Sequence, residues 1–158
     1  EFLSFLKPIE KRKHMRRSRR MLVIPKAKEN PKKEVNEILT NNGIKVEKIE
    51  TELIGNEAVV WITTAQEKKA KSVLSKKDIK SFTSDVVIVK LQDKPGELAK
   101  IARILSSSDI MLKDAHLILK DGKSALYGIT TNRPKETAKM VEKIVNFMES
   151  EDKQEKSI

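Results

Sequence analysis

The chain contains no cysteine among its 158 residues. This absence excludes disulfide bonds, thiolate metal sites, Cys-x-x-Cys redox sites and cysteine nucleophiles. No apolar run approaches the roughly 18 residues of a membrane span, and the first nine residues lack the long apolar stretch of a secretory signal. We therefore expect a cytoplasmic protein in a reducing compartment, with no membrane partner.

Histidine and aromatic residues are also scarce. His14 and His116 are the only histidines and lie in different segments, so no histidine metal triad or Ser-His-Asp set can be assembled. We expect no catalytic residue, no metal site and no cofactor, and hence no enzyme. His116 is expected to be a packed or surface imidazole. The alternative is that it lines a pocket together with Asp114, which shares its strand face.

The two largest aromatic side chains fall in predicted strands. Trp61 and Tyr127 occupy the strands on which an RNA-recognition module would stack bases, but such a module needs several aromatics, and each strand offers one. Packing is the better explanation for both.

The net charge of +10 is unevenly distributed. Residues 1–20 hold eight basic and two acidic side chains, which gives +6, and the other 138 residues share 25 basic and 21 acidic ones, which gives +4. Such an arm can bind phosphate backbones without reading sequence. The chain does not begin with Met, and Met15 and Met21 are alternative starts. The arm is therefore either a disordered native segment or added upstream sequence, and nucleic-acid binding through it is the less favoured alternative.

An internal repeat organises the remaining chain. Two segments of about 65 residues begin at Leu22 and Val86. Ile62–Thr64 aligns with Ile129–Thr131 at an offset of 67. Pro31 aligns with Pro95 at an offset of 64, which predicts two additional residues in the first helix region of the second copy.

Each copy has the same pattern of expected elements: a strand, a helix started by proline, a hairpin and a second helix. The expected ranges are strands 22–24, 44–54 and 58–63 in the first copy, and 86–91, 110–119 and 124–130 in the second. A closing strand at Ile79–Phe82 is expected in the first copy alone. Thr64 and Glu67 form a predicted capping box, and Ala138, Val141, Ile144, Val145 and Met148 form an apolar stripe.

This order predicts an α+β fold of two ferredoxin-like βαββαβ modules in tandem, each with an antiparallel sheet and helices on one face. The expected limits are 1–20 for the basic arm, 21–83 and 84–148 for the two modules, and 149–158 for a charged tail. A second module without a fourth strand has an unpaired sheet edge that another segment or another chain could cover.

The junction Asp93-Lys94-Pro95-Gly96 has helix-start chemistry. Pro95 fixes φ at a value that suits a first helical turn. Gly96 has no side chain to cover the backbone N–H groups that are expected to point outward there. Such a helix start suits a carboxylate or another anion. Asp93 either faces an ammonium group or, in an ordinary helix start, is the N-cap residue.

The run Val87–Ala102, followed by Leu105 and Asp109-Ile110, resembles the ACT domain family. Members of this family have a strand, an Asp/Asn-x-Pro-Gly-x-Leu turn, a helix and a Gly-x-Asn-Ile step into the second strand. The resemblance covers the second copy from Val86 to about Met148, and the first copy only through the repeat. It implies a tandem ACT-type regulatory protein that binds an amino acid or similar molecule where modules meet, and that forms a homo-oligomer through module pairing.

The resemblance also implies a ligand site in the second copy. The expected ligand contacts are Asp93, Lys94, Pro95, Gly96, Glu97 and Leu98 at the turn, and Met111 at the step into the second strand. The first copy has Glu29-Asn30-Pro31 without glycine at its turn, so its own site is expected to be degenerate. Either the two copies build one composite site between them, or the first copy is purely structural. Two alternatives remain: an assembly module without a ligand, and a nucleic-acid-associated protein that acts through its arm.

Overall fold

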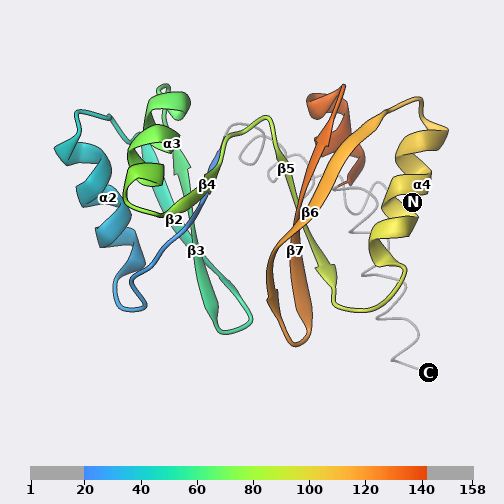
Figure 1. Ribbon diagram of the computed structural model, residues 1–158, viewed down its shortest axis with the longest axis horizontal. Coiled ribbons are helices and arrows are strands. Elements are labelled where there is room, and N and C mark those ends of the chain that lie inside the picture. The colour runs from blue at the N-terminus through green and yellow to red at the C-terminus, as the bar shows by residue number, and fades with distance from the viewer. Residues whose placement is uncertain (1–19, 142–158) are drawn as a thin grey trace, which may run out of the picture. The chain divides into compact units, whose positions relative to one another are not determined.

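The computed structural model describes residues 20–141. They form two compact units, module 1 over residues 20–86 and module 2 over residues 87–141 (Figure 1). Each is an antiparallel sheet with helices on one face, so the predicted α+β fold of tandem ferredoxin-like modules is confirmed. Residues 1–19 of the predicted arm and the whole charged tail lie outside the described residues. Within residues 20–141, no helix is long and apolar enough to span a membrane.

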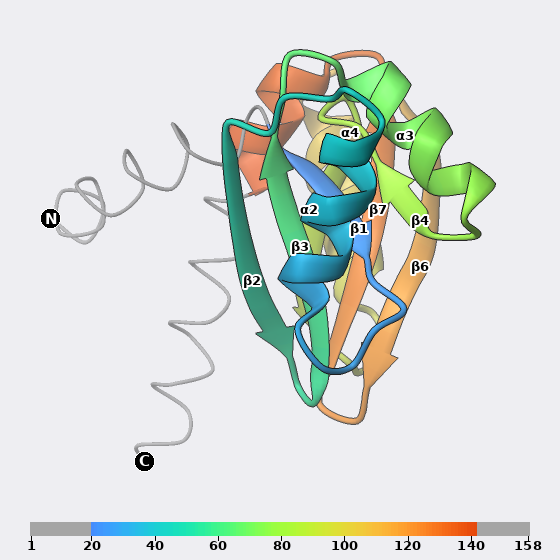
Figure 2. The same ribbon diagram turned by 90° about the vertical axis from the view of Figure 1, so that its left-hand side faces the viewer.

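Module 1 contains a four-stranded sheet in the order β2-β3-β1-β4. Leu22 of the central strand β1 lies opposite Trp61 of β3 on one side and Phe82 of β4 on the other, so the predicted closing strand is confirmed. Figure 2 shows both helices on the same face of this sheet. The elements are β1 (Met21–Ile24), α2 (Pro31–Asn41), β2 (Lys48–Ile54), β3 (Glu57–Thr63), α3 (Glu67–Lys76) and β4 (Lys80–Phe82).

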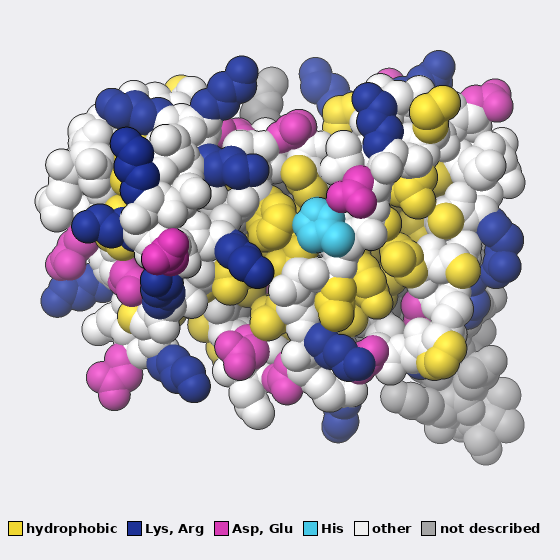
Figure 3. Space-filling model, viewed as in Figure 1, with side chains coloured by type: hydrophobic (Ala, Val, Ile, Leu, Met, Phe, Trp, Pro, Cys, Tyr) yellow, Lys and Arg dark blue, Asp and Glu magenta, His cyan; other side chains and the backbone are white. Residues whose placement is uncertain are grey.

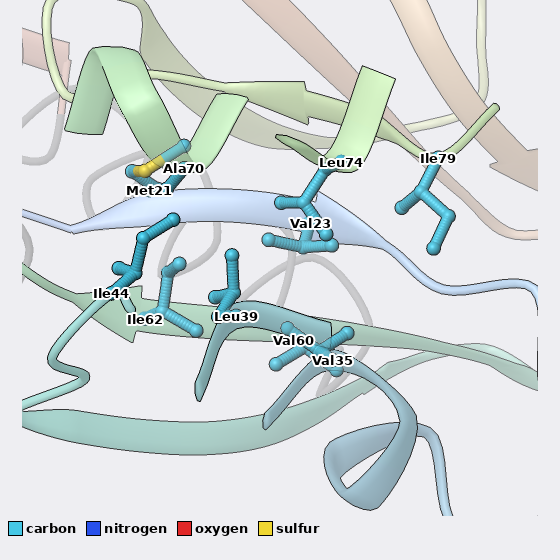
Figure 4. Packing of buried hydrophobic residues seen from close by; sticks show 10 residues of the cluster. All are labelled: Met21, Val23, Val35, Leu39, Ile44, Val60, Ile62, Ala70, Leu74 and Ile79. Carbon is cyan, nitrogen blue, oxygen red and sulfur yellow. The ribbon is translucent and has the colours of Figure 1, made fainter. Parts of the chain in front are cut away.

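The core of module 1 lies between the sheet and its two helices. Strand alternation directs Met21 and Val23 of β1 towards the helices, where both are fully buried (Figure 4). Helical spacing supplies the opposing layer, because residues four apart lie on one face of a helix. That layer consists of Val35 and Leu39 from α2 and Ala70 and Leu74 from α3.

Module 2 contains a three-stranded sheet in the order β5-β7-β6 within the described residues. Its elements are β5 (Val87–Gln92), α4 (Glu97–Ser107), β6 (Leu112–Asp121) and β7 (Ser124–Thr131), and a further helix begins at residue 134 and continues to residue 141. Ala138 and Val141 of that helix pack on the core, together with Ile101 and Leu105 of α4. The other three residues of the predicted stripe, Ile144, Val145 and Met148, lie outside the described part of the chain.

Residues of the first helices in the two modules correspond at a sequence offset of 66. Helices α2 and α4 both have 11 residues, and buried Val35 and Leu39 correspond to buried Ile101 and Leu105. Pro31 is the first residue of α2, whereas Pro95 precedes the N-cap of α4. The predicted two-residue insertion is therefore wrong, because the two prolines occupy different positions of similar turns.

The predicted capping box at Thr64 and Glu67 is also wrong. The N-cap of α3 is Gln66, and Thr64 lies in the preceding loop, where its hydroxyl donates to the Lys45 carbonyl at 2.8 Å. Glu67 instead accepts hydrogen bonds from the Ser84 backbone N–H at 2.6 Å and the Ser84 hydroxyl at 2.8 Å. The helix starts later than predicted because the Thr64 hydroxyl closes the loop before it.

Candidate ligand-binding turn

The predicted site lies in the loop that joins β5 to α4. The Asp93 N–H donates to the Lys123 carbonyl at 3.0 Å, and the Lys94 N–H donates to the Gln92 carbonyl at 2.9 Å. The first of these bonds attaches the loop to the turn between β6 and β7. Figure 1 shows the loop and that turn at the same end of module 2. Two segments distant in sequence therefore form this end of the module.

The start of α4 is set by a glycine in the left-handed conformation. Gly96 is the N-cap, with φ 87° and ψ −8°, and no side chain caps the helix. The alternative with Asp93 as N-cap is therefore wrong, and Pro95 lies before the helix and not in its first turn. A Cβ on Gly96 would meet nothing within 4 Å, so its φ, and not crowding, favours glycine here. The first backbone N–H groups of α4 have no acceptor within the helix.

Asp93 faces an ammonium group that belongs to the protein. Its Oδ2 lies 3.4 Å from the Nζ of Lys120, near the end of β6. The Asp93 side chain is 22% exposed and that of Lys120 is 57% exposed. The carboxylate is thus held near the surface, beside a lysine that can move away without disturbing the core. Lys120 could not be predicted as a partner of Asp93, because only the folding of β6 alongside β7 brings it close.

Glu97 is a buried carboxylate at the first position of α4. Its side chain is 6% exposed, and its Oε1 lies 3.3 Å from the Nζ of Lys100 and 3.7 Å from that of Lys94. A carboxylate withdrawn from water needs such compensation. The Glu97 side chain is therefore already partnered, which leaves its backbone N–H as the group that belongs to the candidate site.

The last two predicted ligand contacts, Leu98 and Met111, lie at opposite ends of α4. The Leu98 side chain packs against the core of module 2, so only its backbone belongs to the turn. Met111 is 64% exposed and lies beyond the other end of α4, whose 11 residues span about 16 Å. The Met111 N–H donates to the Asn132 Oδ1 at 2.9 Å, and the Asn132 N–H donates to the Met111 carbonyl at 3.2 Å. Within module 2, Asp93–Leu98 come together and Met111 stands apart.

The equivalent loop of module 1 is hydrogen-bonded to a glutamate side chain of the same module. Its N-cap, Asn30, is also left-handed, with φ 49° and ψ 55°. The Glu34 Oε1 accepts hydrogen bonds from the backbone N–H groups of Lys26 at 3.0 Å and Ala27 at 3.1 Å. This carboxylate was not singled out from the sequence, although a glutamate in the first turn of a proline-started helix is a recognisable signal. The loop of module 1 is closed by the chain itself.

The aromatic side chains have packing roles. The Arg20 guanidinium carbon lies 4.4 Å from the centre of the Trp61 ring, and the Trp61 Nε1 donates to the Glu52 Oε1 at 2.8 Å. Tyr127 packs against the core of module 2. Trp61 is only 7% exposed, so its ring is not available for base stacking.

Other charged groups do not assemble into a second site. His116 is a surface residue whose Nδ1 lies 3.1 Å from the Oδ2 of exposed Asp114. No cluster of three or more potential metal-ligating side chains occurs among residues 20–141. Figure 3 shows Lys and Arg side chains interspersed with Asp and Glu on the face drawn. Among the described residues, the β5–α4 turn therefore remains the best candidate for a binding site.

A family model described as "ACT domain pair" matches residues 23–156. The chain belongs to the ACT domain pair family. The match includes both copies of the repeat, so the resemblance detected in the second copy is confirmed and extends to the first. The β5–α4 turn and the β1–α2 loop are accordingly the strand-to-helix turns of the two ACT modules.

Several solved structures are similar to this ACT domain pair. A protein from Bacteroides thetaiotaomicron is 17% identical, with a TM-score of 0.40, over 79% of this chain and 86% of that chain. The regulatory subunit of aspartate kinase from Thermus flavus is 15% identical, with a TM-score of 0.36, over 77% and 88%. The acetolactate synthase small subunit from Thermotoga maritima is 13% identical, with a TM-score of 0.31, over 77% and 83%. No match was found among curated proteins.

Proposed function

We propose that this ACT domain pair is a regulatory protein that binds an amino acid, or a closely related small molecule, at the β5–α4 turn and has no catalytic activity of its own. Membership of the ACT family favours this function. The observation that carries it is the helix start at Gly96, where the first backbone N–H groups of α4 have no acceptor within the helix and lie in the same turn as the Asp93 carboxylate. The proposed contacts are Asp93, Lys94, Pro95, Gly96, Glu97 and Leu98.

The two charged groups of an amino acid match the two features of the turn. The α-carboxylate would accept hydrogen bonds from the first N–H groups of α4, at the positive end of the helix dipole. The α-ammonium would pair with Asp93 and replace the Lys120 ammonium, whose Nζ lies 3.4 Å from the Asp93 Oδ2. Met111 would need a second module to take part, because α4 separates it from Gly96 within module 2.

Regulation would follow from differential affinity. A ligand stabilises whichever conformation binds it better, and shifts the population by the ratio of the two affinities. No chemistry at the ligand is required.

A calorimetric titration of the full-length protein with each standard amino acid tests the proposal. We expect at least one amino acid to bind, and Gly96→Asp to abolish that binding by placing a carboxylate at the helix start. Gly43→Asp is the matched control, because Gly43 also has a positive φ, 74°, but lies in module 1. Folded wild-type protein that binds no amino acid would overturn the proposal.

The second candidate function is an assembly platform without a ligand. In module 1 the central strand β1 pairs with both β3 and β4, whereas in the described part of module 2 β5 pairs with β7 alone. An unpaired edge can be covered by a strand of another chain, which would give a homo-oligomer. Light scattering of wild-type and Gly96→Asp protein separates the two candidates: an oligomer that persists in both, without amino-acid binding by wild type, favours assembly alone.

A further inference from the structure

The β1–α2 loop of module 1 holds a carboxylate through consecutive backbone amides. The N–H groups of Lys26 and Ala27 both donate to one oxygen of Glu34, at 3.0 and 3.1 Å. Successive N–H groups directed at one point form a concave site of the kind that binds anions in proteins. Here the anion is a side chain of the same module.

The loop occupies the same place in the fold as the candidate turn of module 2. It follows the first strand and leads into the first helix through a left-handed N-cap, Asn30 in module 1 and Gly96 in module 2. Glu34 corresponds to Lys100 at the offset of 66, and Lys100 contacts Glu97 instead of the loop amides. The carboxylate that fills this loop therefore has no counterpart in module 2, where the amide equivalent to that of Ala27, the Asp93 N–H, donates to the Lys123 carbonyl at 3.0 Å.

We propose that Glu34 is a built-in carboxylate ligand of module 1: its side chain occupies a carboxylate-binding loop and excludes free carboxylates. The attachment of Glu34 to α2 gives it a high effective concentration at the loop, so a free carboxylate competes poorly. The expectation that the ligand binds at module 2 rests on the proposed function, in which the ligand carboxylate meets the first N–H groups of α4 and not the equivalents of these loop amides. The existence of the filled site in module 1 does not.

Chemical rescue of Glu34→Ala by acetate tests the site directly. The substitution removes the Cγ and the carboxylate, which are the atoms that acetate resupplies. We expect Glu34→Ala to melt several degrees below wild type, and added acetate to recover part of the loss. In nitrogen-15 NMR spectra of the full chain, acetate is expected to shift the Lys26 and Ala27 amides of the variant and to leave them unchanged in wild type.

Glu37→Ala is the matched control, because Glu37 is an exposed glutamate on the same helix. Its melting temperature is expected to respond to acetate as wild type does, and sodium chloride at the same ionic strength is expected to rescue neither variant. If acetate does not shift the Lys26 and Ala27 amide signals of folded Glu34→Ala protein, the proposal is wrong. If Glu34→Ala does not fold, Glu34→Gln replaces it: faster hydrogen exchange at Lys26 and Ala27 than in wild type supports the site, and unchanged exchange contradicts it.

The outcome is separable from that of the proposed function. Failed acetate rescue with intact amino-acid binding by wild type overturns the role of Glu34 alone. Successful rescue without amino-acid binding by wild type overturns the ligand at module 2 and leaves the filled site of module 1 in place.

Discussion

The first helices of the two modules both follow a left-handed N-cap residue, but in different chemical surroundings. Asn30 and Gly96 are both left-handed N-caps, and each precedes an 11-residue helix. In module 1 a glutamate at position 34 turns back onto the loop amides, whereas in module 2 a lysine at the equivalent position 100 contacts a buried glutamate. A reversal of charge at one helical position thus accompanies two arrangements: loop amides that bind a carboxylate of the same module, and a loop without such a carboxylate.

Packing constrains the core residues of the two modules more than the residues around their loops. The buried pairs Val35 with Leu39 and Ile101 with Leu105 keep their spacing, because a close-packed core tolerates little change in volume. The loop requires only a residue that adopts the left-handed conformation at the N-cap, and both glycine and asparagine can do so. Residues around the loop are therefore free to diverge and to change what the turn holds.

The largest expected effect comes from opening a cavity at the equivalent core positions. Leu39→Ala and Leu105→Ala each remove a fully buried side chain, and each is expected to lower the free energy of unfolding by about 2 to 5 kcal/mol. Urea unfolding monitored by circular dichroism and NMR measures both. A cost below about 1 kcal/mol in one module would show that the two cores are not equivalent.

The next effect comes from the backbone conformation of Gly96. Gly96→Val forces a β-branched residue into a positive φ and is expected to cost about 1 to 3 kcal/mol. Gly96→Asn copies the residue that module 1 uses at this position and is expected to cost less than about 1 kcal/mol. Equal losses in urea unfolding for the two variants would contradict the equivalence of the two helix starts.

A smaller effect is expected for the carboxylate of module 1. Glu34→Gln keeps an acceptor oxygen but removes the charge, and the charge-assisted bonds to Lys26 and Ala27 are worth about 1 kcal/mol more than neutral ones. Thermal unfolding measures the loss, with exposed Glu37→Gln as the control of equal charge change. Indistinguishable melting temperatures for the two variants would mean that Glu34 contributes little to its loop.

The smallest effect concerns the cation beside Asp93. Lys120→Gln removes the ammonium that the ligand is proposed to replace, so the affinity for the amino acid is expected to rise about two- to fivefold, or up to about 1 kcal/mol. Calorimetry measures the change, with exposed Lys113→Gln on the same strand as the control. A weaker affinity for Lys120→Gln would instead mean that Lys120 contacts the ligand carboxylate.

Much of the fold could be predicted from the sequence, because local patterns determine it. The β-branched run at 22–24 and the helical spacing of Ile101 and Leu105 predicted a strand and a helix without any tertiary contact. The exact start of α4 could not be predicted, because Pro95 and Gly96 suit several turn geometries. Lys120 and Glu34 were missed because their roles arise only when the β6–β7 turn and the β1–α2 loop fold back.

An NMR titration with the amino acid that binds in calorimetry locates its binding site within the two modules. With nitrogen-15-labelled full-length protein, we expect saturable shifts in the backbone N–H signals of the non-proline residues of 93–98 and none in those of 25–34. Shifts centred on residues 25–34, or no binding by any amino acid to the folded protein, would contradict the account.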